Sequence, residues 1–240
     1  MTNVLLIEDD VEIARIIRYY LGQKDIYQVE WASNAQQAWD KARSGFDVIL
    51  LDIMLPDSNG IELCTRLREW YGCPIIFISC LGDSDTIIQA LERGGDDYIV
   101  KPFDNGILHA RIQANLRRVR HEKKMKMPSG FECRFFSLDA QNHLLIKDGK
   151  KIPLVPMESR LLAFFMQNPD QYFVASELYQ MIWGKQSYGD NRTVTVHIYN
   201  LRRKLEDDPS QPRFLKNIWG KGYVFDPEGN ENAAQNGNHG

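Results

Sequence analysis

The stretch from Val48 to Pro56 constrains the fold of this chain more than any other. It reads Val-Ile-Leu-Leu-Asp-Ile-Met-Leu-Pro, so apolar and β-branched residues surround a single charged residue, Asp52. Such a run predicts a strand buried on both faces, as in parallel sheets covered by helices. An unpaired carboxylate is costly to bury, so Asp52 is expected at the carboxyl end of the strand. There it can either face a ligand-binding crevice or simply cap the next helix.

Apolar strand-like runs alternate with amphipathic helical stretches through the first half of the chain. Besides the Asp52 strand, the expected strands cover residues 3–7, 27–31, 74–78 and 97–100. The expected helices cover residues 11–22, 34–44, 59–70, 84–93 and 104–119. This alternation predicts an α/β domain over residues 1–121, with a doubly wound, five-stranded parallel sheet covered on both faces.

A charged stretch followed by Met-Pro-Ser-Gly interrupts this pattern and predicts a linker over residues 122–130. An α+β domain is expected over residues 131–226. Its strands are predicted at 131–137, 143–146, 151–154, 213–218 and 223–225, with a hairpin turn at Asp148-Gly149. Its helices are predicted at 157–167, 175–183 and 192–206. The Asn/Gly-rich tail, residues 227–240, is expected to be disordered.

Charge is unevenly distributed along the 240 residues, although the net charge is only −3. Residues 1–118 carry 12 Lys and Arg against 18 Asp and Glu, and the remainder carries 17 against 14. This asymmetry favours a cation site in the first domain and a polyanion partner for the second. The four cysteines show no zinc-site spacing, and no apolar run reaches 18 residues. We therefore expect a cytoplasmic protein without a membrane partner.

Five polar side chains follow the predicted strands at positions that can converge. Glu8 and Asp9 follow the first strand, and Asp52, Ser79 and Lys101 follow the third, fourth and fifth strands. The carboxyl ends of neighbouring strands meet at the switch point of a doubly wound sheet. Clustered carboxylates favour Mg²⁺ or Mn²⁺, and a lysine can neutralise an anion. The set suits phosphoryl transfer onto Asp52, although each residue alone could be a helix cap or a turn residue.

This spaced set resembles the receiver domains of response regulators in two-component signalling systems. The resemblance rests on the five residues above together with Pro56 and Gly60, Asp96-Asp97-Tyr98 and Lys101-Pro102-Phe103. It implies a flavodoxin-like fold in which Asp52 is the phosphoacceptor. It also implies that Asp9, Asp52 and the backbone carbonyl of Met54 bind Mg²⁺, with Glu8 helping through water. Lys101 and Ser79 would contact the phosphoryl group, Tyr98 would be an aromatic switch, and Asp10 would be a helix cap.

The helix predicted at residues 192–206 has one apolar face and one basic face. The apolar stripe consists of Val194, Ile198, Leu201 and Leu205. The opposite face carries Arg192, Val196, Tyr199, Asn200 and Arg203, with His197 and Arg202 beside it. Arginine can contact phosphate or guanine, and asparagine can pair with adenine, so the face suits the DNA major groove. A solvated basic face is the alternative.

The second domain resembles the winged-helix output domain of the OmpR/PhoB subfamily. The resemblance rests on residues 191–198, residues 201–206 and Gly220-Lys221-Gly222-Tyr223. It implies DNA contacts from Arg192, Thr193, His197, Tyr199, Asn200, Arg202, Arg203 and Lys221. It also implies that residues 184–190 form a loop toward RNA polymerase. One departure is Trp219, which stands where the subfamily often carries a basic residue able to enter the minor groove.

The second departure concerns the face through which receivers of this subfamily dimerise. Asp97 and Arg111 are retained as an expected ion pair, whereas Ile87 and Ile107 replace another charged pair. We expect a partly apolar dimer contact there, which would be less sensitive to salt than an ionic one. Together the two resemblances imply a transcription factor that a sensor histidine kinase phosphorylates and that binds promoter DNA as a homodimer. An aspartyl-nucleophile phosphatase and a phosphorylation-independent DNA-binding regulator are the alternatives.

Overall fold

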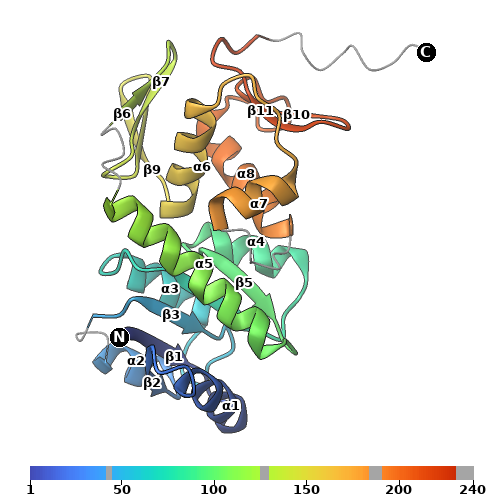
Figure 1. The fold of residues 1–240 in the computed structure, drawn as a ribbon. Helices are drawn as coiled ribbons and strands as arrows, with labels where there is room; N and C mark the ends of the chain where they lie inside the picture. Colours follow the sequence, from blue (N-terminus) through green and yellow to red (C-terminus); the bar gives the residue numbers. More distant parts are fainter. Residues whose placement is uncertain (42–44, 125–129, 184–190, 231–240) are drawn as a thin grey trace. The chain divides into compact units, whose positions relative to one another are not determined.

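The computed structural model describes residues 1–41, 45–124, 130–183 and 191–230. Contacts divide the chain into two compact units, of which the first contains Met1–His121 and the second begins at Glu122. Each unit has its own sheets and helices (Figure 1). Among the described residues, none of the helices combines the length and the apolar composition that crossing a membrane requires.

The first unit is built on a parallel sheet with the strand order β2-β1-β3-β4-β5. Its strands are β1 (Thr2–Ile7), β2 (Tyr27–Ala32), β3 (Val48–Leu51), β4 (Ile75–Ser79) and β5 (Asp97–Val100). The sheet is extended in one direction by β2 and in the other by β3, β4 and β5, so the switch point lies between β1 and β3. The predicted doubly wound, five-stranded sheet is confirmed, and its order places β1 and β3 side by side at the crevice.

Five helices accompany this sheet, close to the predicted positions. They are α1 (Val11–Gly22), α2 (Ala35–Lys41), α3 (Gly60–Arg68), α4 (Ser84–Glu92) and α5 (Asn105–Lys124). Asp10 caps α1, because its Oδ1 accepts hydrogen bonds from the backbone N–H groups of Glu12 and Ile13. Helix α5 continues five residues beyond its predicted end at Val119, so residues 122–124 of the predicted linker are helical.

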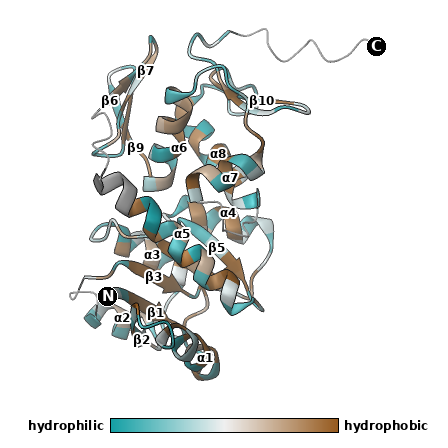
Figure 2. Cartoon of the chain, in the orientation of Figure 1, coloured by the Kyte–Doolittle hydropathy of each residue, from teal (hydrophilic) through white to brown (hydrophobic). Residues whose placement is uncertain are grey.

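Helices α1 and α5 cover one face of the parallel sheet. Ile17 and Leu21 of α1 and Leu108 and Ile112 of α5 pack in one apolar cluster with alternate residues of the strands, including Leu50. All four residues of β3 are buried, and the strand is hydrophobic along its length (Figure 2). Residues that alternate with this set point to the opposite face. Burial on both faces explains why β3 is uniformly apolar up to Asp52.

The second unit begins with an antiparallel sheet of four strands, β6 (Gly130–Glu132), β7 (Phe136–Asp139), β8 (Leu144–Lys147) and β9 (Lys150–Pro153). Helices α6 (Pro156–Gln167), α7 (Ala175–Trp183) and α8 (Asn191–Leu205) follow, and the hairpin β10 (Leu215–Ile218) and β11 (Gly222–Phe225) comes last. The predicted single strand over residues 131–137 is wrong. A turn separates two strands there, closed by a hydrogen bond from Cys133 N–H to the Phe136 carbonyl.

Aromatic side chains join the two ends of the second unit. The ring of Phe136 in β7 lies 5.2 Å from that of Phe214, just before β10, and 6.1 Å from that of Phe225, the last residue of β11 (distances between centroids). All three rings are buried. The ordering of strands, three helices and a final hairpin is the predicted winged helix-turn-helix arrangement. Of the tail expected to be disordered, residues 231–240 lie outside the described residues.

Candidate functional site

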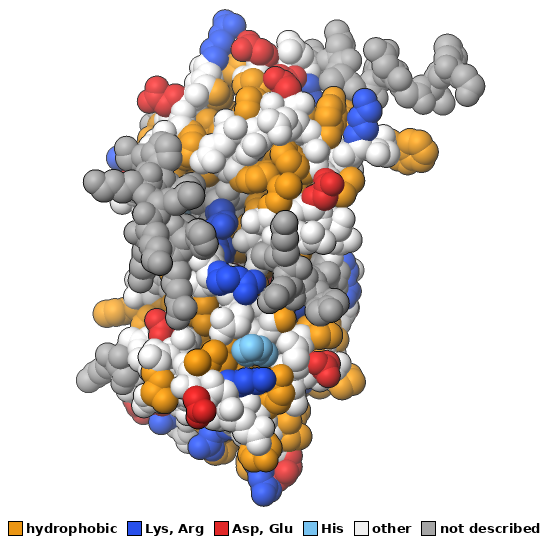
Figure 3. Space-filling view, in the orientation of Figure 1, with side chains coloured by type: hydrophobic (Ala, Val, Ile, Leu, Met, Phe, Trp, Pro, Cys, Tyr) orange, Lys and Arg blue, Asp and Glu red, His pale blue; other side chains and the backbone are white. Residues whose placement is uncertain are grey.

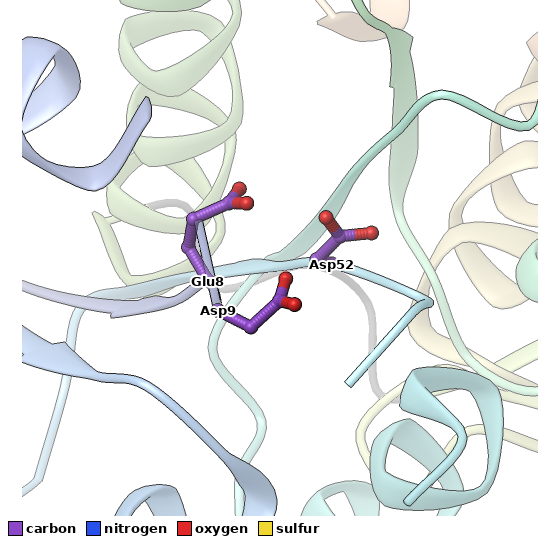
Figure 4. A group of neighbouring side chains, drawn as sticks. All are labelled: Glu8, Asp9 and Asp52. Atoms are coloured by element: carbon purple, nitrogen blue, oxygen red, sulfur yellow. The ribbon is translucent and has the colours of Figure 1, made fainter. Parts of the chain in front are cut away.

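Three carboxylates meet where β1 and β3 end. Glu8 and Asp9 follow β1 directly, Asp52 follows β3, and one oxygen from each lies within 4.8 Å of the others. Figure 4 shows the Asp9 and Asp52 carboxylates pointing into the same space, with Glu8 beside them. Glu8 and Asp52 are buried, whereas Asp9 is exposed. The predicted convergence of strand-end residues is therefore present at the switch point.

Lys101, which follows β5, reaches into this acidic pocket. Its Nζ donates hydrogen bonds to Glu8 Oε1 at 2.8 Å and to Asp52 Oδ2 at 2.5 Å. The second oxygen of Glu8 lies 2.7 Å from the same nitrogen but makes no hydrogen bond of acceptable geometry. The lysine side chain is only 7% exposed. One ammonium thus faces three carboxylates, which leaves the pocket with an excess of negative charge.

Burial and the neighbouring charges shift the pKa values of Glu8 and Lys101. Burial raises the pKa of Glu8 to about 7, against the opposing effect of Lys101 and with support from the charge of Asp52. For Lys101, burial disfavours the ammonium, but hydrogen bonds to Asp52 and Glu8 and their charges outweigh it and raise the pKa. The lysine therefore stays protonated as a fixed cation.

The residues present fit a hard divalent cation. Three carboxylates supply the oxygen ligands that Mg²⁺ and Mn²⁺ prefer. One Glu8 oxygen is buried without a hydrogen-bond donor, and the exposed side chain of Asp9 leaves a route for an ion to enter. A dication would neutralise the charge that Lys101 leaves uncompensated, so this pocket could hold one.

Binding of Mg²⁺ is expected to strengthen roughly tenfold between pH 6 and pH 8, because the cation competes with a proton on Glu8, whose pKa is about 7. Calorimetric titration of the full chain at pH 6, 7 and 8 measures this dependence. Glu8→Gln should flatten it, and a wild-type affinity that is constant with pH would contradict the prediction. In the absence of a dication, a rise in pH has the opposite effect and lowers folding stability. The pKa of Glu8 is raised in the folded state, so its protonation favours folding at low pH, and this contribution is lost as pH rises through about 7.

The loop after Asp52 is held tightly against it. Met54 N–H donates to Asp52 Oδ1 at 3.1 Å, and Met54 pairs with Asn59 in an isolated β-bridge. Asn59 then caps α3, since its Oδ1 accepts from Ile61 N–H at 2.8 Å. A Cβ on Gly60 would lie 2.0 Å from the backbone oxygen of Asp52, so this approach requires glycine. The loop thus fixes the carboxylate and leaves the Met54 side chain exposed.

Ser79 and Tyr98 lie together beside the pocket. Ser79, the last residue of β4, is completely buried, and its Oγ accepts a 3.4 Å hydrogen bond from Leu81 N–H. Tyr98 of β5 is 4% exposed, stacks on Phe77 and donates its hydroxyl to the Leu81 carbonyl. Burial raises the pKa of Tyr98 to about 12, although the hydrogen bond with Ser79 opposes the rise. The aromatic ring therefore already points inward in this structure.

Asp96, immediately before β5, anchors a buried ionic network that the sequence does not predict. Its Oδ1 accepts from Arg118 of α5 at 2.7 Å, and its Oδ2 accepts from Ile75 N–H at 2.9 Å and from Arg68. Asp96 and Arg118 are at most 4% exposed. One carboxylate thus ties the end of α3 and the second half of α5 to the sheet. The Asp96-Asp97-Tyr98 motif marks the position, but no spacing rule identifies the two arginines.

The residues expected to form the dimer contact are mostly covered. Arg111 donates to Asp97 Oδ1 at 2.7 Å and to the Tyr98 carbonyl at 2.8 Å, which confirms the ion pair. Both partners are buried, Ile87 is 3% exposed, and Ile107 is half-buried. Ile87 is therefore covered in this structure, and the partly apolar dimer contact stays a prediction. Use of Ile87 by a second copy would require a conformation that exposes it.

Helix α8 exposes a narrower basic face than its sequence predicts. Arg192, Tyr199 and Arg203 are exposed, and Arg202 is half-buried. The remaining predicted contacts, Thr193, His197 and Asn200, are at most 2% exposed. His197 lies beside Trp183 of α7 with 5.8 Å between ring centroids. These three side chains are therefore covered in this structure, and their contacts with DNA stay predictions.

Helix α8 and the β10–β11 hairpin are joined by buried polar contacts. Glu206, immediately after α8, accepts from the backbone N–H groups of Arg213, Phe214 and Leu215 at 2.8–3.3 Å. Arg202 Nε donates to the Leu215 carbonyl at 2.8 Å, and its guanidinium lies 5.8 Å from the ring of Tyr223. The end of α8 is therefore connected directly to the residues at the start of the hairpin.

Comparison with known proteins agrees with both halves of this description. Residues 4–113 match the family described as response regulator receiver domain, and residues 149–225 match transcriptional regulatory protein, C terminal. The doubly wound sheet with its acidic pocket thus defines a receiver domain, and the second unit defines the output domain of a transcriptional regulator.

Full-length relatives share both domains. Transcriptional regulatory protein SrrA of Staphylococcus aureus is 32% identical over 242 residues, covering 98% of this chain and 100% of SrrA. Solved structures of two RitR mutants superpose with TM-scores of 0.71 and 0.69 at 27% and 26% identity, each covering 94% of this chain and 99% of the other. The chain belongs to the response regulators of the OmpR/PhoB type, which are two-component transcriptional regulators.

Proposed function

We propose that Asp52 accepts a phosphoryl group from the phosphohistidine of a sensor kinase and that this controls DNA binding. The single observation that carries the proposal is the contact of 2.5 Å between Lys101 Nζ and Asp52 in a pocket with two further carboxylates. Asp52 is fixed at the switch point, and the side chain of Lys101 lies beside it to neutralise an incoming anion. Asp52 acts here as an acceptor and not as the catalyst of a turnover reaction, apart from slow loss of its own phosphoryl group.

The residues support transfer by in-line displacement. An oxygen of Asp52 attacks phosphorus while the bond from phosphorus to the histidine nitrogen breaks, so the phosphoryl group moves and imidazole leaves. Lys101 holds positive charge beside Asp52 and stabilises the phosphoryl oxygens. Mg²⁺ or Mn²⁺, bound by Glu8, Asp9, Asp52 and the Met54 carbonyl, supplies further charge neutralisation when present. Ser79 ends β4, the strand that pairs with β3, and is proposed to turn its hydroxyl toward the product.

Phosphorylation is proposed to shift the receiver toward a dimer. Contacts of a new phosphoryl group with Lys101 and Ser79 alter the hydrogen bonds that now hold Tyr98, and the population of dimer-competent receivers rises. Two output domains then occupy adjacent half-sites about one DNA turn apart. Arg192, Tyr199 and Arg203 are the α8 side chains exposed for this contact. The loop proposed to contact RNA polymerase, residues 184–190, lies outside the described residues.

Mass spectrometry combined with size-exclusion chromatography tests the proposal. The full chain is incubated with acetyl phosphate in Mg²⁺ and, as the matched control, in EDTA. We expect a mass gain of one phosphoryl group per chain and a shift to dimer in Mg²⁺ only. Phosphorylated protein should also bind promoter DNA more tightly than unmodified protein. DNA binding that is strong and unchanged after complete phosphorylation would contradict phosphorylation control and favour a phosphorylation-independent regulator.

A further inference from the structure

Trp219 is the most exposed large apolar side chain in the described part of the second unit. It is 98% exposed, whereas Trp183 of the same unit is 1% exposed. An indole in water leaves a large apolar surface hydrated, which is unfavourable by about 25 cal/mol per Å². A surface of this kind at a fixed position is typical of a contact that another molecule covers.

The hairpin that carries Trp219 is held at its base. Ile218 pairs with Gly222, so Trp219, Gly220 and Lys221 form the tip, and Lys221 N–H closes it through the Ile218 carbonyl at 3.0 Å. Phe173 and Tyr223 exchange backbone hydrogen bonds of 2.9 and 2.8 Å. Gly222 adopts a φ of +95°, and a Cβ there would lie 2.3 Å from the Phe173 carbonyl oxygen. The base is thus close-packed, while the tip projects from the unit (Figure 1).

The surroundings of Trp219 are aromatic and cationic. Lys221 lies at the same tip, with its Nζ 5.1 Å from the ring of Tyr172, which is itself 48% exposed. Lys216, lower on the hairpin, is buried and paired with Asp226 at 2.7 Å, so it is not available to a partner. Figure 3 shows hydrophobic side chains at the surface of this part of the chain, with both basic and acidic side chains near them. Charge complementarity favours a polyanion as the molecule that covers the tip.

We propose that Trp219 enters the DNA minor groove beside the half-site as an apolar wedge. The inference rests on the proposed DNA-binding function and names one determinant of it. With the exposed face of α8 in the major groove, a hairpin joined to that helix through Glu206 and Arg202 is carried to the neighbouring minor groove. The groove is about 6 Å wide, and an aromatic ring about 3.5 Å thick fits it edge-on. Lys221 contacts the flanking phosphate.

An indole selects DNA differently from a cation at the same position. A basic side chain is attracted by the strong negative potential of a narrow, A-tract minor groove. A wedge instead favours steps that unstack and widen easily, such as TA and CA, because it packs against sugars and base faces. We therefore expect this protein to prefer flexible pyrimidine–purine steps at the position under the hairpin tip, independently of the bases read by α8.

Selection from a random duplex pool, with the full phosphorylated chain, supplies the site and the first readout. Binding is then measured for wild type and for Trp219→Ala, Trp219→Phe, Trp219→Arg and Lys221→Ala at several salt concentrations. We expect Trp219→Ala to weaken specific binding roughly tenfold without changing the salt dependence, since no charge is removed. Trp219→Phe should recover part of the affinity. The slope of log affinity against log salt concentration should become steeper in Trp219→Arg, by about the amount expected for one additional phosphate contact. In Lys221→Ala it should become shallower by the same amount.

Fluorescence quenching by acrylamide reports on Trp219 directly. The contribution of this residue is the difference between wild type and Trp219→Phe, and we expect DNA to protect it from quenching. Full affinity of Trp219→Ala, or quenching unchanged by DNA, would overturn the wedge while leaving the DNA-binding function intact. Dissociation of the dimer by Trp219→Ala in the absence of DNA would also overturn it, by assigning the indole to a second copy. Failure of wild type to enrich any duplex would instead refute the proposed function.

Discussion

Full-length protein carrying Asp52→Asn is expected to gain no phosphoryl mass under conditions in which wild type gains one group per chain. An amide lacks the anionic oxygen that attacks phosphorus, so the rate of phosphorylation is expected to fall more than about a hundredfold. The neighbouring acids do not replace it. Glu8 is completely buried, and its carboxylate is bound to Lys101. Asp9 is exposed and has no contact with Lys101 among those found in the described residues.

Asp10→Asn is the matched control for this substitution. Asp10 lies in the same acidic motif, but its Oδ1 caps α1 through Glu12 and Ile13, and asparagine caps a helix as well as aspartate does. Phosphorylation of this variant should match wild type within a factor of two or so. Intact mass measured over a time course, followed by peptide mapping, separates the two outcomes. Phosphoryl uptake by Asp52→Asn at another residue would show that the acceptor is assigned wrongly.

Asp96→Asn is expected to destabilise the receiver by about 3–5 kcal/mol, the largest stability effect in this domain. The substitution preserves shape but removes the charge that Arg118 contacts at 2.7 Å and that also pairs with Arg68. Arg118 is 4% exposed and cannot recover water as a partner without moving. Two guanidinium groups are then left around a neutral amide, which is why the cost exceeds that of an exposed ion pair.

Native-state hydrogen exchange of the β4 and β5 amides measures this loss of stability in the full chain. It is preferred to a global unfolding measurement, because a chain of two domains does not have a single well-defined free energy of unfolding. Asp85→Asn is the control, because Asp85 is exposed in the first turn of α4 and should cost less than about 1 kcal/mol. A loss below about 1 kcal/mol for Asp96→Asn would show that the arginines find other partners and that the network contributes little.

The receiver pocket could be predicted from sequence because strand ends are predictable. An apolar run that stops at a charged residue locates the end of a buried strand, and parallel topology brings such ends together. Asp52, Glu8 and Lys101 were placed by this argument alone, and the structure joins them. The ionic network of Asp96 is not predictable in this way, since its partners come from α3 and α5 and depend on how those helices lie against the sheet. Long-range contacts of this kind leave no periodic signal.

The output helix shows a different limit. The stripe formed by Val194, Ile198 and Leu201 correctly identifies the buried centre of α8. Helical periodicity does not give the width of the buried surface, which depends on the neighbouring elements. Trp183 of α7 lies against His197, and Asn200 is buried as well, so both leave the exposed face. The turn between β6 and β7 was missed for a related reason, because residues 133–135 contain neither glycine nor proline.

The hydrogen bonds that Glu206 accepts from three backbone N–H groups also constrain the DNA that this protein can use. A carboxylate at the end of α8 that holds residues 213–215 leaves the hairpin little freedom to swing relative to the helix. The separation between a major-groove contact and a contact at the hairpin tip is then set by the protein. A target site cannot compensate for one inserted base pair by moving the hairpin, so the adjustment must come from bending or twisting of the duplex. Half-sites should accordingly tolerate sequence changes better than changes in length.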